Sequence, residues 1–539
     1  MKNRDEPLAR DAEMAQTITK VAEESTRGSL YLFSGTALAT VTMAVASILI
    51  GRLLGPELYG QYTIALTIPQ FLFIIADLGI NQGIIKFTAT YTAKGETAKA
   101  VNTIKQGLIL KTAVGTVLFL INFAFADILA ATILQRPELA LQLKLVSTSI
   151  IFQTIFTTVT SAAVGLDKTE YNAFITEIQA LAKTIISITL VLMGLGVAGA
   201  LIGYSTGYVI ASVLGVITLY SLTRKLRGKD SAKTDSTTEL RKLIKYSAPL
   251  YISILLAGLI PFYQNILLAI FTTDADIGNY KAAINFVALT NTLSTPITTA
   301  LLPAFSKLEL STKKNLKTFF KLANKYTTYI MIPATILIIT YSTEIVQTIY
   351  GSTYVTAPLF LAIHSVIYLL VGIGYLTLTS FYNGQGETKT TLTMGLITFA
   401  TLAILSPPLT KTYSVQGLII AFVIAVATGT IYAFSKAKNK FQLDFERNSL
   451  LKIYAISIIS AVPSILITHL ASPPKLINLT VGAILYLAIY ITLTPLSGVV
   501  NQKELEMVST ITSKTRPLKI IAKPFLDYQQ KILRKTHRR

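Results

Sequence analysis

The sequence contains no cysteine and no tryptophan, three histidines in 539 residues, and only 14% charged residues. Without cysteine there are no disulfides, thiolate nucleophiles or Cys-ligated metals. The histidines His364, His469 and His537 are far apart in the sequence, which argues against a His-based metal site. A soluble protein of this length would be about one quarter charged. The composition therefore excludes most soluble folds, and we expect no cofactor and no metal site.

Apolar runs are abundant, because 52% of the residues are hydrophobic. Runs of eighteen or more residues are long enough to cross a bilayer as helices, and they lack the alternation of a membrane β-barrel. The sequence predicts an all-α polytopic membrane protein with about fourteen transmembrane helices. The expected spans are 29–51, 61–84, 105–126, 145–166, 172–194, 196–220, 246–270, 280–303, 322–341, 357–382, 391–409, 414–435, 452–471 and 476–497.

The basic residues predict the orientation of the spans. With the N-terminus inside, nearly all of the 48 Lys and Arg residues fall in cytoplasmic segments. The net charge of +21 is thus mostly a topology signal, and no nucleic-acid partner is expected. We predict a multi-pass protein of the cell membrane with both termini in the cytoplasm. The expected parts are a cytoplasmic N-terminal segment (1–28), a first six-helix lobe (29–220), a cytoplasmic linker (221–245), a second lobe (246–435), two accessory helices with their loop (436–497) and a basic tail (498–539).

The basic tail mixes Ile, Leu and Phe with its Lys and Arg residues. Two interpretations stay open: an amphipathic segment on the anionic inner leaflet, or a solvated tail that helps to set topology.

A repeat relates the two predicted lobes. Shifting the sequence by 218 residues places Gly60-x-Tyr62 on Gly278-x-Tyr280 and Val197-x-Gly199 on Val415-x-Gly417. Gly165 and Gly384, which end the fourth and tenth spans, lie 219 apart. Equivalent positions are six spans apart, so both copies have the same orientation. Parallel repeats of this kind are an architecture of secondary transporters.

Several stretches resemble the polysaccharide and oligosaccharide flippases. They are "ILIGRLLGPELYGQYTIA", "ADLGINQGIIKF", "KYSAPLYIS" and "GNYKAA". This family is a branch of the superfamily that also holds multidrug and toxin extrusion transporters and lipid II flippases. The resemblance covers about residues 25 to 500. It implies two parallel six-helix lobes around a central cavity plus two C-terminal helices, alternating access, and export of a polyprenyl-linked oligosaccharide for glycan biosynthesis.

Polar residues inside the expected spans are the candidate substrate site, because buried charges in a membrane usually face a cavity or a partner. Lys183 lies near mid-membrane, with Gln179 on the same helix face, and an ammonium there suits a phosphate or pyrophosphate headgroup. Lys111 shares its face with Asn122, but snorkelling to the inner headgroups is an alternative. Arg52, near the outer mouth, either guides a phosphate or pins the first turn. The candidates in the second half are His364, Tyr368 and Tyr375, which either stack on sugars or pack between helices.

Asp77 and Asn81 share a stripe on the second span. Asp77 is either a proton or cation site, or a permanent partner of Lys183 or Lys111. Glu177 is another possible partner of Lys183. The coupling ion, H⁺ or Na⁺, is therefore left open.

Two other functions stay open at this point. One is a cation-coupled multidrug antiporter of the same superfamily, although residues 29–51 contain no Asp or Glu. The other is a membrane glycosyltransferase or polysaccharide polymerase, which the short outer loops argue against; we therefore expect no enzyme. Besides its lipid-linked substrate and membrane lipids, the expected partners are glycan biosynthesis enzymes, and the chain is expected to act as a monomer.

Overall fold

The computed structural model describes residues 37–226, 236–308, 313–471, 474–502, 504–506 and 516–536. Almost all of these residues are helical, and none of them is in a strand, which confirms the predicted fold class. Contacts divide the chain into two units, residues 1–278 and 279–539. The predicted N-terminal segment 1–28 lies outside the described residues.

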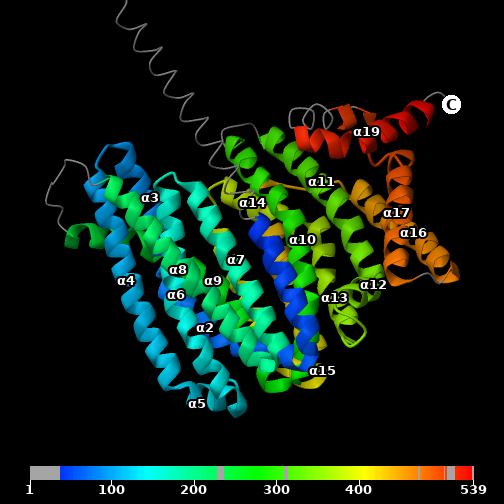
Figure 1. The fold of residues 1–539 in the computed structure, drawn as a ribbon. Helices are drawn as coiled ribbons and strands as arrows, with labels where there is room; N and C mark the ends of the chain where they lie inside the picture. The colour runs from blue at the N-terminus through cyan, green and yellow to red at the C-terminus, as the bar shows by residue number, and fades with distance from the viewer. Residues whose placement is uncertain are drawn as a thin grey trace, which may run out of the picture. The chain divides into compact units, whose positions relative to one another are not determined.

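The first unit begins with a helix over residues 37–65. The later elements are α2 (Thr67–Asp77), α3 (Ile80–Ala93), α4 (Thr97–Ala124), α5 (Ala126–Ile128), the π-helix η1 (Leu129–Ile133), the 3₁₀-helix η2 (Pro137–Leu139), α6 (Ala140–Gly165), α7 (Thr169–Leu190), the π-helix η3 (Val191–Leu195), α8 (Gly196–Leu226), α9 (Ser236–Phe271) and the start of α10 (Asp274–Lys307). In Figure 1, α4, α6, α7 and α8 run side by side, and α9 packs on α2, α3 and α4.

The second unit holds the rest of α10 and the elements after it. They are α11 (Lys313–Thr340), α12 (Ser342–Ile349), α13 (Ala357–Ser365), the 3₁₀-helix η4 (Val366–Ile373), α14 (Thr377–Gly384), α15 (Thr388–Phe441), α16 (Arg447–Ala471), α17 (Lys475–Leu496) and α19 (Arg516–Thr536). An aromatic core that includes Phe305, Phe320, Phe381 and Phe445 packs α10, α11 and α14 together. The predicted tenth span is broken, because α13 with η4 meets α14 at a bend of 49°.

Among the described residues, nine helical stretches are long and apolar enough to cross a membrane, or ten if the bent pair is one span. Three of the nine are 54 to 57 residues long, about twice the length that a bilayer needs. Each of these three folds back on itself.

α15 demonstrates the fold-back. Lys440, near its C-terminal end, pairs with Glu387, which directly precedes its first residue. The two ends of a straight helix of 54 residues would be about 80 Å apart. The reversal occurs at Tyr413 and Ser414, where the backbone leaves helical geometry and Ser414 takes a φ of 53°. α15 therefore contains two antiparallel crossings, as the predicted spans 391–409 and 414–435 require.

The other two long stretches break at glycines. Gly194 and Gly196 take positive φ between α7 and α8, and Ser187 on α7 then donates to the carbonyl of Ala200 on α8. Near the N-terminus, helical geometry runs through the expected turn at 52–60, but Gly55 takes a φ of 74°. Ser47 and Tyr59 are consequently in hydrogen-bond contact at 2.7 Å, which a straight helix would prevent. The total of fourteen spans stays a prediction.

Equivalent glycines of the repeat make equivalent contacts. Gly165, at the end of α6, packs against the backbone of Ile84 and Ile85. Gly384, at the end of α14, packs against the backbone of Leu302 and Ser306, about 218 residues further on. In both copies the glycine allows the end of one helix to approach another helix at backbone distance.

The small residues of α8 follow the same rule. Gly199, Gly203 and Gly207 are four residues apart, and a Cβ on any of them would meet α7 or η3 at 3.0 Å or less. In the second copy, Gly417 meets the carbonyl of Leu409 on the other arm of α15, and the following small residues Ala421 and Ala425 are fully buried. Spacing of this kind lets membrane helices pack closely.

Candidate functional site

A buried lysine lies at the centre of the first unit. Lys111 on α4 is completely inaccessible to solvent. Its Nζ donates to Asp77 Oδ1 at 2.8 Å, Asn81 Oδ1 at 2.7 Å and Thr157 Oγ1 at 3.3 Å. An ammonium has three donors, so each of the donors has an acceptor. Of the two partners proposed for Asp77 from sequence, the structure gives Lys111.

The local sequence explains why these groups converge. Asp77 is the last residue of α2, and the next two residues, Leu78 and Gly79, take left-handed φ values of 49° and 67°. This break turns Asp77 and Asn81, which lie on either side of it, toward the same ammonium. Gly79 is required by its φ and also by space, because a Cβ there would lie 2.7 Å from the carbonyl oxygen of Ser247 on α9.

Glycines on α4 bring the neighbouring helices close to Lys111. Gly107 and Gly115, one turn before and after it, pack against Ile84 and Thr154. Such close approach leaves no path for the lysine side chain to reach the headgroup region. Burial beside Asp77 replaces the snorkelling alternative.

Asn122, on the same face of α4, has a different environment. Its amide donates to Ser147 Oγ at 2.7 Å and to the carbonyl of Leu143 at 3.2 Å, and the side chain is fully buried. These bonds fasten α4 to α6 at a distance from Lys111 of eleven residues along the helix.

Lys183 lies in a second polar group. It is half-buried, and its Nζ lies over the ring of Tyr204 at 5.0 Å from the centroid, within the range of a cation–π interaction. Tyr204 contacts Tyr208 edge to face, and the hydroxyl of Tyr208 accepts from Gln153 Nε2 at 3.3 Å. Glu177, considered from sequence as a partner of Lys183, accepts instead from Thr42 at 2.9 Å.

The two lysine groups are joined through α6. Gln153, which reaches Tyr208, and Thr157, which reaches Lys111, are four residues apart and so lie on one face of the helix. The polar chain is defined as Lys183, Tyr204, Tyr208, Gln153, Thr157, Lys111, Asp77 and Asn81. It contains two lysines and one carboxylate, which gives these residues a formal net charge of +1.

Four of these residues, Gln153, Thr157, Tyr204 and Tyr208, were not among the sequence candidates. The available signal was the four-residue spacing of Gln153 with Thr157 and of Tyr204 with Tyr208. Threonine and tyrosine are frequent in this chain, so spacing alone does not single them out.

Gln179 lies one turn before Lys183 on α7 and is 1% exposed. Among the described residues, neither its amide nitrogen nor its amide oxygen has a hydrogen-bond partner. Buried amides are normally paired. Gln179 is therefore equipped to bind a polar ligand group near Lys183.

Arg52 is exposed, and no acidic residue of the described chain pairs with it. A different arginine fastens a turn in this unit. Arg136 donates to the carbonyls of Ala269 at 3.0 Å and Thr272 at 2.5 Å, and it pairs with Asp274. Sequence analysis did not identify this role of Arg136.

The second-half candidates lie in the second unit. His364 is 6% exposed and lies near the ring of Phe422, and its Nδ1 has no hydrogen-bond partner among the described residues. The hydroxyl of Tyr368 donates to Asn291 Oδ1 at 2.5 Å, and the rings of Tyr368 and Tyr375 are 6.4 Å apart. These residues form an aromatic group that carries no net charge.

The comparisons with known proteins agree with this architecture. The family model described as "Polysaccharide biosynthesis protein" matches residues 25–309, more than half of the chain. The chain belongs to this family. The resemblance stated from the sequence is confirmed, and the family's members are transporters rather than enzymes. A search of curated proteins finds no match.

Solved structures show the same fold at low sequence identity. The lipid II flippase MurJ, in an inward closed conformation, is 17% identical with a TM-score of 0.68, covering 86% of this chain and 99% of its own. An inward-facing multidrug resistance MATE transporter of the MOP superfamily is 16% identical with a TM-score of 0.59, covering 74% and 94%. A MOP superfamily transporter from Pyrococcus furiosus is 15% identical with a TM-score of 0.53, covering 78% and 96%. The chain is a multi-pass membrane protein with the fold of this transporter superfamily.

Proposed function

We propose that this protein moves polyprenyl-linked oligosaccharides, joined through phosphate or pyrophosphate, from the cytoplasmic to the outer leaflet of the cell membrane by alternating access. Membership of the polysaccharide biosynthesis family supports this substrate class. The observation that carries the proposal is the polar chain, since a membrane helix bundle does not need a net positive charge for stability.

Lys183 is the first contact for the headgroup in this proposal. All three donors of Lys111 have acceptors, whereas Lys183 is half-buried and so accessible to a ligand. A phosphate beside an ammonium in a low-dielectric site gains much more than it would in water. The amide of Gln179 and the hydroxyls of Tyr204 and Tyr208 supply hydrogen bonds that suit the headgroup or the first sugar.

A second candidate function is cation-coupled antiport. The observation that favours it is the pairing of Asp77 with Lys111 and Asn81. A proton or Na⁺ that binds Asp77 competes with Lys111 for the carboxylate, and the freed ammonium then attracts an anion. The same pair therefore serves a drug antiporter or an ion-coupled flippase.

The test is flipping of a fluorescent polyprenyl-pyrophosphate oligosaccharide in proteoliposomes. Lys183→Gln is compared with wild type, and Lys105→Gln, which changes an exposed lysine on α4, is the matched control. We expect flipping to fall at least about tenfold in Lys183→Gln, the loss of roughly one charge-assisted hydrogen bond, and to be unchanged in Lys105→Gln.

Each alternative has its own result. A wild-type protein that moves no such lipid but exchanges organic cations for H⁺ or Na⁺ is an antiporter. If Lys183→Gln folds and flips at the wild-type rate, the polar chain does not bind the headgroup.

A further inference from the structure

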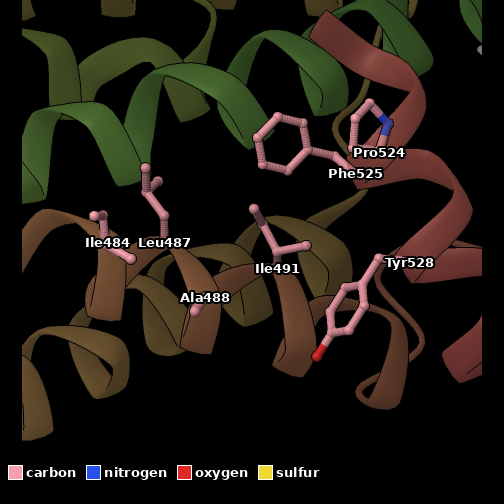
Figure 2. A pocket seen from close by; sticks show the side chains of 7 residues that line it. All are labelled: Ile484, Leu487, Ala488, Ile491, Pro524, Phe525 and Tyr528. Carbon is pink, nitrogen blue, oxygen red and sulfur yellow. The ribbon is translucent and has the colours of Figure 1, made fainter.

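An apolar groove lies between α17 and α19 in the second unit. α17 contributes Ile484, Leu487, Ala488 and Ile491, and α19 contributes Pro524, Phe525 and Tyr528 (Figure 2). The α17 residues are spaced three and four apart, so they form one face of the helix. The groove has a volume of about 530 Å³, within the range of ligand pockets.

The groove is a fixed part of the fold, because α19 is docked. Gln529 is 4% exposed, and its amide donates to Tyr329 Oη at 2.7 Å and Thr494 Oγ1 at 3.2 Å. Leu526 and Leu533 are buried in the core that includes Ile332. In Figure 1, α19 crosses α17 rather than continuing along it.

The walls suit a hydrocarbon chain. Ile484 is 65% exposed and Phe525 49% exposed, and the one hydroxyl in the lining, that of Tyr528, already has a partner in Thr492 at 3.0 Å. α17 crosses the membrane, and Leu476 and Val481 along it are also exposed. The groove thus offers an apolar surface to a lipid and no free polar group to a sugar.

The charge of α19 selects the headgroup. The helix contains six Lys and Arg residues and one acidic residue. Lys523 and Lys531 are exposed on either side of the groove-lining segment 524–528, and Lys531 follows Tyr528 by one turn. On the topology that the basic residues predict, this helix lies at the cytoplasmic leaflet, which is anionic.

We propose that the groove binds an acyl chain of a resident anionic phospholipid, whose phosphate pairs with Lys531 and Lys523. This site is separate from the polar chain of the first unit, and the proposal does not depend on what the protein transports.

The absence of tryptophan from the sequence gives a clean test. Phe525→Trp places a single indole in the groove wall, and its fluorescence is quenched by phospholipids that carry brominated chains. Full-length protein is reconstituted with brominated phosphatidylglycerol or brominated phosphatidylcholine at equal mole fractions. We expect apparent binding of the anionic lipid to be at least about fivefold tighter, as one lysine near an anionic surface would give.

Two variants complete the test. Ile404→Trp changes a lipid-exposed position on α15 and should be quenched equally by both lipids. Adding Lys523→Gln and Lys531→Gln to Phe525→Trp should bring the preference close to one. If Phe525→Trp does not give a monodisperse protein, Tyr528→Trp reports on the same groove.

Equal quenching by the two lipids in Phe525→Trp, or no quenching, overturns the proposal. So does relief of quenching by a polyprenyl-pyrophosphate sugar at concentrations where unbrominated phosphatidylglycerol has no effect, because the groove would then hold the substrate's tail. These readouts do not require transport, so they stand whether or not the flipping assay succeeds.

Discussion

Gly60 and Gly278 are equivalent residues of the repeat, and each packs against the backbone of the other copy. A Cβ on Gly60 would lie 1.9 Å from the carbonyl oxygen of Asp274, and a Cβ on Gly278 would lie 1.8 Å from that of Pro56. Pro56 and Asp274 are themselves 218 residues apart. The two copies of the turn therefore meet in a reciprocal contact, of the kind that a twofold axis produces.

The first prediction concerns this contact. Gly60→Ala and Gly278→Ala should each destabilise the protein by at least about 1–3 kcal/mol, because backbone cannot move aside as a side chain can. Thermal unfolding in detergent measures the effect. Gly395→Ala is the control, since a Cβ there meets nothing within 4 Å. Wild-type melting of Gly60→Ala would contradict the close approach.

The second prediction concerns the buried ion pair. Lys111→Met alone leaves Asp77 without its cation and should cost about 3–5 kcal/mol. The double variant Lys111→Met with Asp77→Leu removes both charges and should recover most of that stability. Thermal stability and monodispersity of the two proteins are compared. If the double variant is no more stable than the single one, the pair is not the origin of the loss.

The double variant also separates structure from transport. Because it keeps the fold without the charges, its flipping rate reports whether Asp77 and Lys111 take part in coupling. A rate that loses its dependence on a pH or Na⁺ gradient identifies the pair as the ion site.

The third prediction concerns Arg136, whose guanidinium binds two carbonyls and Asp274. Arg136→Lys should lower the free energy of unfolding by about 2–3 kcal/mol, because one ammonium cannot reproduce a fork of donors. Lys144→Ala, which breaks an exposed pair with Asp127, should cost less than about 1 kcal/mol. Equal losses in the two variants would rule out a special role for Arg136.

The fourth prediction is a pH dependence at Glu387. Its hydrogen bond to Lys440 lowers the pKa of the Glu387 carboxyl. A lowered pKa stabilises the folded state above the ordinary carboxyl pKa, and this stabilisation is lost as the pH falls through the lowered value. The melting temperature of wild type should exceed that of Glu387→Gln slightly at pH 7, and the difference should vanish near pH 3. A difference independent of pH would show that the pair contributes nothing electrostatic.

The sequence predicted the helical membrane class and the family, because long apolar runs and the repeated glycines carry their physical reasons locally. Gly165, Gly199 and their equivalents must be glycine or similarly small wherever two helices touch at backbone distance. Such a requirement shows itself as spacing, without knowledge of the partner helix.

Pairings between distant helices could not be predicted in this way. Helical periodicity places Asp77 and Lys111 on faces of their own helices, but not which helix each face meets, so Asp77 was left between two lysines. The break at Leu78 and Gly79, which aims Asp77, depends on the approach of α9. Arg136 was missed for the same reason, since its acceptors lie more than 130 residues away.

The charges do not follow the symmetry of the glycines. At the shift of 218 residues, Lys111 corresponds to Tyr329, Asp77 to Thr295 and Lys183 to Thr401. Tyr329 accepts a hydrogen bond from Gln529 and so helps to dock α19. A duplicated ancestor would have had matching chemistry in both copies; in this chain one copy has kept or gained the ionic residues, and the other has become the anchor for a C-terminal addition. An artificial protein built from two first copies would therefore pack its turns correctly, yet it would hold two ion pairs and offer no seat for α19.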